Sequence, residues 1–251
     1  KSDVGTVSLD KDALDELATV TEPVVISIKA TDTDQSNPTW EVTVTSGEGE
    51  NNEIFDEGID TEAITISVPY TDKSATTENT KVYCIDDGME DMGATFADNR
   101  LTWTTSHLST FAAVTLGAND TITYTTANGV DSTSDLSTAL SSVKDGGTIT
   151  LLKDATLKAD ITISKNITID GQGKYKIDAK PAKDHAITVA PGGALTLKDV
   201  TLNITDEENQ IGTYGLDVQY GATLTLNNAE IDVSGVSNAT ISASWGSNSK
   251  E

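Results

Sequence analysis

Apolar and polar residues alternate along most of the chain, with the period of two that marks half-buried β-strands. The apolar positions are mainly Val, Ile and Leu, and Thr, Ser, Asn and Asp stand between them. This composition favours strands over a helical bundle and predicts an all-β fold. In the first half of the chain, strands are predicted at residues 24–29, 40–44, 63–70, 81–86, 100–105 and 111–116.

Turn-forming residues separate these strands. Residues 32–38 are polar and end in proline, so we expect a turn that returns 40–44 as the partner of 24–29. A second turn is predicted at residues 86–88, Asp-Asp-Gly, between the fourth and fifth strands. Strands at this spacing predict a compact, sandwich-like β-rich module.

A short helix is predicted near the start of the chain, over residues 11–18. Asp10 is a suitable N-cap residue, and acidic residues fill the first turn after it. Leu14 and Leu17 are expected to share one face of this helix.

A second module is predicted after residue 117. Residues 117–130 are polar and rich in Thr, and we place the boundary near residues 117–120. The chain then divides into an acidic β-rich module, residues 1–117, and a second module, residues 118–251.

The second module is predicted to open with a helix at residues 135–143. Two glycines at positions 146 and 147 end this helix, and a strand follows at residues 148–152. The apolar face of the helix is formed by Leu136, Ala139, Leu140 and Val143.

An internal repeat is the strongest pattern in the second module. Residues 187–204 match residues 216–233 without a gap, at an offset of 29 (216 minus 187). Gly192 and Gly221 coincide, and an earlier, looser copy covers residues 161–169. The matched apolar pairs are Ile187 with Leu216, Val189 with Val218, Leu195 with Leu224, Leu197 with Leu226, Leu202 with Ile231, and Ile204 with Val233.

The fixed offset favours coils stacked on one another over ordinary meander strands. Short strands in each coil would point alternate side chains into a narrow tube, and stacking would bury the aliphatic rows. Gly192 and Gly221 suit the corners, because glycine adopts backbone conformations that other residues avoid. We expect the N-terminal coils of a parallel β-helix, with residues 205–214 protruding as a loop.

The charge of the chain limits its partners. Its 251 residues include 16 basic and 40 acidic side chains, a net charge of −24. Residues 1–120 carry 24 acids and 6 bases (net −18), and residues 121–251 carry 16 acids and 10 bases (net −6). This asymmetry supports two modules. It argues against nucleic acid or an anionic membrane as a partner, because phosphate binding needs clustered Lys and Arg.

Targeting and membrane signals are missing from the sequence. No apolar run reaches the roughly 18 residues that a membrane-spanning helix needs. The sequence starts at Lys1 without a signal peptide and ends without a stop signal, so we expect a truncated fragment of a longer protein.

Metal-binding and nucleophilic residues are scarce. Cys84 is the single cysteine, which excludes an intramolecular disulfide, and we interpret it as a buried small hydrophobe. His107 is interpreted as a packed structural residue, and His185 as an exposed residue at a turn. Residues 32–37 fail the EF-hand pattern because Asn37 stands where glycine is required. We expect no metal and no cofactor.

The second module also lacks the residues of a polysaccharide-cleaving enzyme. It contains no arginine, since Arg100 is the only one in the chain. Asp170, Asp199 and Asp232 lie near predicted turns, where capping of backbone N–H groups is the simpler role. We therefore expect no enzymatic activity.

The end of the first module resembles a known family. Residues 101–114 read Leu-Thr-Trp-Thr-Thr-Ser-His-Leu-Ser-Thr-Phe-Ala-Ala-Val, and residues 69–70 (Pro-Tyr) and 82–88 (Val-Tyr-Cys-Ile-Asp-Asp-Gly) precede them. This set resembles the closing part of a module recurrent in clostridial surface proteins. The resemblance covers residues 1–116 and implies a cell-wall-associated location outside the cell.

The opening of the second module carries another resemblance. Its helix, Gly-Gly pair and strand, over residues 135–152, are similar to the N-terminal cap of pectate-lyase-like right-handed β-helices.

These observations predict an extracellular adhesin of a Gram-positive bacterium, with a β-helical stalk that displays a recognition surface. The partner is a host glycan, a mucin or a host protein such as an immunoglobulin. Two alternatives are the non-catalytic part of a β-helical polysaccharide lyase or glycoside hydrolase, and a stalk without a ligand. The candidate binding residues are the aromatic side chains and acidic loop residues Tyr214, Tyr220, Trp245, Glu207 and Glu208.

Overall fold

The structure, a computed structural model, consists mainly of strands. It describes residues 5–21, 23–32, 37–46, 49–50, 63–86, 88–180, 185–205, 214–234 and 239–244. The prediction of an all-β fold is confirmed, because these ranges contain many strands and two helices of seven residues each. No described helix has the length and apolar character that a membrane crossing requires.

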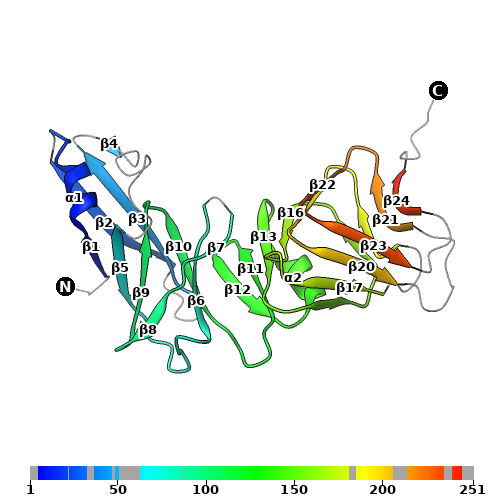
Figure 1. Cartoon of the computed structure of the whole chain (residues 1–251), viewed down its shortest axis with the longest axis horizontal. Helices are drawn as coiled ribbons and strands as arrows, with labels where there is room; N and C mark the ends of the chain where they lie inside the picture. Colours follow the sequence, from blue (N-terminus) through cyan, green and yellow to red (C-terminus); the bar gives the residue numbers. More distant parts are fainter. Residues whose placement is uncertain are drawn as a thin grey trace. The chain divides into compact units, whose positions relative to one another are not determined.

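The chain divides into two compact units (Figure 1). Lys1–Gly117 together with Ala127–Asp131 form the first unit, and Ala118–Thr126 together with Ser132–Glu251 form the second.

Two antiparallel sheets make up the first unit. One has the strand order β1-β5-β9-β8, and the other has the order β2-β3-β10-β6-β7, with β4 paired to β3. The bounds are β1 Thr6–Leu9, β2 Val24–Asp32, β3 Thr39–Ser46, β4 Gly49–Glu50, β5 Ile64–Pro69, β6 Thr80–Cys84, β7 Glu90–Asp91, β8 Thr95–Ala97, β9 Arg100–Thr105 and β10 Thr110–Thr115.

One hydrophobic core is shared by both sheets of the first unit. Alternate residues of β3 and β5 are buried in it, as the period-two pattern requires. The Trp103 ring lies 6.2 Å from the Trp40 ring and 5.2 Å from the Phe111 ring, measured between centroids. Because Trp103 belongs to one sheet and the other two residues to its partner, these aromatic contacts join the two sheets.

All six strands predicted in this unit are present, and β2 pairs with β3 as expected. The prediction of a direct turn from residues 81–86 to residues 100–105 is wrong. The chain instead forms β7 and β8 in between, and β6 and β9 belong to different sheets. Strands of two or three residues are too short to show a periodic pattern in the sequence.

Helix α1 (Lys11–Leu17) begins at Asp10, whose carboxylate accepts hydrogen bonds from the N–H groups of Asp12 (3.0 Å) and Ala13 (2.9 Å). The predicted face was wrong. Ala13 is buried and Leu17 packs partly against the core, whereas Leu14 is 53% exposed. The helix therefore contacts the core through residues four apart in sequence.

The chain next forms a hairpin that the sequence did not reveal, β11 (Ile122–Thr126) and β12 (Gly129–Thr133). Strand β11 belongs to the second unit, whereas residues 129–131 of β12 belong to the first. We expected a polar boundary segment there. Thr123 and Thr125 are fully buried, and the Thr125 hydroxyl accepts a hydrogen bond from the Thr148 N–H at 2.9 Å. Buried threonines that satisfy their hydroxyl groups inside the fold make a core strand look polar in sequence.

Helix α2 (Leu136–Ser142) confirms the second predicted helix. Asp135 caps it by accepting the Thr138 N–H at 2.9 Å, and the four predicted apolar residues are buried. At its C-terminal end the Lys165 ammonium donates to the carbonyl oxygens of Ser141 and Val143. The apolar face packs against β11 and β14.

Twelve further strands pair in three parallel ladders (Figure 1). The first ladder is β13-β16-β19-β22, continued antiparallel by β11, the second is β14-β17-β20-β23, and the third is β15-β18-β21-β24. Each successive trio of strands, called a repeat below, adds one strand to every ladder. The bounds are β13 Gly147–Leu151, β14 Ala155–Leu157, β15 Ile161–Ile163, β16 Asn166–Asp170, β17 Lys176–Ala179, β18 Ile187–Val189, β19 Ala194–Lys198, β20 Thr201–Thr205, β21 Tyr214–Gln219, β22 Thr223–Asn227, β23 Glu230–Ser234 and β24 Ala239–Ser244.

The register of these ladders confirms the offset of 29. Leu195 pairs with Leu224 in the first ladder, and the same offset recurs in the other two. The earlier copy is also confirmed, because Ile161 of that copy pairs with Ile187. Gly192 and Gly221 have φ angles of 83° and 79° at the corner, as predicted for glycine.

The connection from the second ladder to the third changes in length between repeats. It covers residues 158–160, 180–186, 206–213 and 235–238 in turn. The strands on both sides of it nevertheless keep their register. The expected protruding loop, residues 205–214, falls on the third of these connections and lies almost wholly outside the described residues.

Aliphatic side chains of the repeats form one continuous core. Along one column of the first ladder, Ile169 and Leu197 are fully buried, whereas Leu226 in the fourth repeat is 45% exposed. Burial therefore decreases toward the last repeat that the structure describes.

This gradient predicts unequal costs for the same truncation. Leu197→Ala should reduce the free energy of unfolding of the second unit by about 3 kcal/mol, because Leu197 is fully buried and its truncation leaves a cavity in the core. Leu226→Ala, at the register partner, should cost about 1 kcal/mol or less, because much of that side chain is already in water. Urea unfolding followed by circular dichroism measures both, and the fluorescence of Trp40 and Trp103, recorded with Trp245→Phe as the background, reports the first unit separately. Equal losses would show that the column is not stacked as described.

Candidate functional site

A groove of about 570 Å³ lies on the second unit, where the chain passes from the first ladder to the second. It is lined by residues from all four repeats, which the sequence places up to 76 positions apart (Asp154 to Glu230). It therefore exists only because the repeats stack in register.

One side of the groove is a column of polar residues on β17, β20 and β23. Lys176 pairs with Thr201, and Thr201 pairs with Glu230. Asp154 extends the column, because its carboxylate accepts the Lys176 N–H at 3.1 Å. Neighbouring strands lie about 4.8 Å apart, so the column runs across the strands for about 14 Å.

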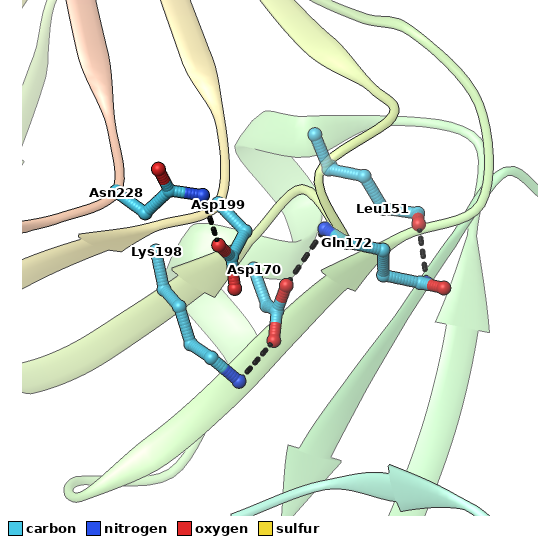
Figure 2. Close-up of polar contacts among 6 residues, drawn as sticks. All are labelled: Leu151, Asp170, Gln172, Lys198, Asp199 and Asn228. Atoms are coloured by element: carbon cyan, nitrogen blue, oxygen red, sulfur yellow. Dashed lines mark hydrogen bonds and ion pairs between the residues drawn. The ribbon is translucent and has the colours of Figure 1, made fainter.

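The other side is formed by the turns after the first ladder. Gln172, Asp199 and Asn228 occupy equivalent turns and have φ angles of 58°, 48° and 49°, the left-handed region that Asn and Asp tolerate better than most residues. Figure 2 shows the Asn228 amide donating to the Asp199 carboxylate at 2.7 Å. The backbone N–H of Gly173 donates to the Asp199 carbonyl at 2.8 Å. The turns are thus bonded to one another along the stack.

Asp170 anchors the turn in the second repeat (Figure 2). Its carboxylate accepts the Gln172 N–H at 2.7 Å and the Lys198 ammonium at 2.9 Å. The Gln172 amide in turn donates to the Leu151 carbonyl at 2.8 Å. The predicted capping role is confirmed for Asp170. It is wrong for Asp232, which lies inside β23 and is exposed.

Tyr175 gives the groove an aromatic surface. Its ring is half-buried, and the Lys174 ammonium lies 5.1 Å from the ring centroid, within the range of a cation–π contact. Gly171 permits the tight turn that presents this ring, because a Cβ there would lie 2.7 Å from the Asp199 carbonyl oxygen.

Charged groups of both signs surround the tyrosine. Three carboxylates (Asp154, Asp199 and Glu230) and two ammonium groups (Lys174 and Lys176) line the groove. Just beyond it, a hydrogen bond from Asn203 at 2.9 Å and the Lys176 ammonium at 3.2 Å lower the pKa of Asp178. These groups offer donors and acceptors side by side.

Of the binding residues predicted from sequence, Tyr220 is the one whose side chain the structure describes, and it does not line this groove. Tyr220 is 67% exposed in the turn between β21 and β22, whereas the groove lies beyond the other end of β22, where the chain passes to β23. Tyr214 begins β21, but its side chain lies outside the described part. Trp245, Glu207 and Glu208 also lie outside the described residues.

Sequence reasoning missed Tyr175. Its local signal is an aromatic residue between Lys174 and Lys176, directly after the glycine-rich turn at residues 171–173. This local pattern alone does not identify a binding site, because Asp199 and Asn228 come to line the same groove only when neighbouring repeats stack.

The single cysteine of the chain and one of its two histidines lie in the first unit. Cys84 is buried, as predicted, and His107 Nε2 lies 3.6 Å from its sulfur. His185, in the second unit, is half-buried rather than exposed as expected, because it precedes the buried residues Ala186 and Ile187. Among the residues that the structure describes, no three or more His, Cys, Asp or Glu side chains gather as a metal site. Most of the failed calcium motif, residues 32–37, lies outside those residues.

Comparisons of the chain with models of known protein families, with curated proteins and with solved structures found no match.

The left-handed turn at Asp199 leads to a stability prediction. Asp199→Ala and Asp199→Gly both remove the hydrogen bond from Asn228, so they differ mainly in backbone preference. Asp199→Gly should be the more stable variant by about 1 kcal/mol, because a Cβ disfavours positive φ. Thermal unfolding followed by circular dichroism gives the difference. A more stable alanine variant would contradict the turn conformation.

Proposed function

We propose that this chain is an extracellular, cell-wall-associated bacterial protein that binds a glycan in the groove beside Tyr175. The observation that carries the proposal is that one aromatic ring lies among carboxylate, amide, hydroxyl and ammonium groups in a single groove. One side of this groove is the column of polar residues, which is about 14 Å long, or about three strand spacings. The chain acts by binding and has no catalytic role.

We also propose that the second unit is the N-terminal part of a right-handed parallel β-helix of the pectate-lyase-like kind, and that α2 is its cap. Three parallel ladders with a shared offset, a common core and glycine corners support this reading. Such a scaffold is rigid, and rigidity reduces the entropy lost when a ligand binds.

The chemistry of the groove suits a sugar chain. A tyrosine ring offers a flat apolar face to the C–H groups of a sugar ring and keeps a polar hydroxyl at its edge. Asp154, Glu230 and Thr201 offer oxygen atoms to sugar hydroxyl groups, and Asn228 can both donate and accept. A column that crosses the strands provides such partners at a regular spacing for an extended polymer.

Charge favours a glycan without sulfate or uronic acid groups. Three carboxylates and two ammonium groups leave the groove with one net negative charge, and the whole chain carries −24. A polyanionic glycan would be repelled by this field at moderate ionic strength. The proposed ligand is therefore a neutral glycan, such as an uncharged mucin-type chain, rather than a pectin or a glycosaminoglycan.

The alternative of a polysaccharide-cleaving unit is less well supported. A general acid must hold a proton near neutral pH, which requires a raised pKa. Asp178 has the opposite shift, because its hydrogen bond from Asn203 lowers its pKa. Asp199 is committed to the turn through its hydrogen bond with Asn228. The second unit also has no arginine.

A glycan array that contains neutral, sulfated and uronic-acid oligosaccharides tests the proposal. We expect binding to neutral chains and a loss of roughly tenfold in affinity for Tyr175→Ala, which corresponds to about 1.4 kcal/mol. Tyr220→Ala is the matched control, because Tyr220 lies on the same unit outside the groove, and it should bind normally.

Two outcomes would contradict this assignment. Loss of binding in Tyr220→Ala but not in Tyr175→Ala would move recognition to the corner predicted from sequence. Release of reducing or unsaturated sugar ends at enzyme-like turnover would replace binding by catalysis.

A further inference from the structure

Cys84 and His107 lie in contact in the first unit, and both belong to residue types that can bind metal ions. Cys84 is the last residue of β6, and His107 lies in the connection between β9 and β10. The pairing of β6 with β10, in which Cys84 faces Phe111, brings the cysteine beside this connection. The distance from the Cys84 sulfur to His107 Nε2 is 3.6 Å.

This separation matches the spacing of two ligands on one tetrahedral metal ion. Zinc lies about 2.3 Å from a cysteine sulfur and about 2.05 Å from a histidine nitrogen. With a tetrahedral angle between the two bonds, the sulfur and nitrogen are about 3.6 Å apart. The observed separation therefore permits both atoms to bind the same ion.

Asp86 is held close to the pair. Its carboxylate accepts hydrogen bonds at 2.7 Å from the Ser109 hydroxyl and from the Thr110 N–H. The Ser109 oxygen lies 3.2 Å from the Cys84 sulfur. Asp86 is exposed and His107 is half-buried, whereas Cys84 itself is buried.

We propose that Cys84 and His107 bind a thiophilic divalent cation of the zinc or cadmium type, with water completing the coordination. On binding, the Cys84 thiol releases its proton to solvent and forms the sulfur–metal bond. His107 binds through the lone pair of neutral Nε2, and its Nδ1–H points to the Ser106 hydroxyl, 3.5 Å away. This site is independent of the glycan groove.

Titration of the intact chain with Co²⁺ and Cd²⁺ tests the site. We expect the near-ultraviolet charge-transfer absorption of a metal thiolate, and its loss in Cys84→Ser. His107→Ala should weaken Cd²⁺ binding at least roughly tenfold, because even the outer partners of metal ligands are worth about that much. His185→Ala, which removes the other histidine, is the matched control and should leave the affinity unchanged.

A measurement on the unmodified chain tests the site even if the variants fail to fold. On addition of Zn²⁺, the ¹⁵N resonance of His107 Nε2 should shift while the His185 resonances stay in place. Absence of a charge-transfer band, an unchanged affinity in folded His107→Ala, or no shift at His107 would each overturn the proposal.

Discussion

The second unit depends on the register of its parallel ladders. Because side chains alternate between the two faces of a strand, a slip of one residue would turn every inward aliphatic side chain to the solvent. The same alternation creates the groove. The register that buries Ile177 and Leu202, and packs the partly buried Ile231 against the same core, places Lys176, Thr201 and Glu230 in line on the outer face. Core and candidate site are therefore two results of one pairing pattern.

The first unit buries the same kind of alternating sequence in a different way. Its two antiparallel sheets face each other, and large aromatic side chains fill the space between them. Its connections bring together residues from strands that are distant in sequence, and the Cys84–His107 pair results from one such contact. In each unit, strand pairing rather than a local sequence motif brings these polar side chains together.

The sequence was most informative where one pattern recurred. A gapless match over 18 residues (187–204) predicted strand partners correctly, because stacked repeats must place equivalent residues on top of each other. The hairpin β11–β12 was missed because its buried threonines resemble a polar linker. The groove was missed because Tyr175 and Asn228 are 53 positions apart (228 minus 175) and belong to different repeats. Side chains from separate repeats meet only after the register is known.

The variable connection between the second and third ladders has an evolutionary consequence. Its length differs among the repeats while the strands beside it remain paired, so insertions at this corner are absorbed locally. The groove lies at a different corner, between the first and second ladders. Selection can therefore lengthen or diversify one corner of the unit while it conserves the other. A single scaffold of this kind can keep the groove unchanged while the surface at the variable connection diverges.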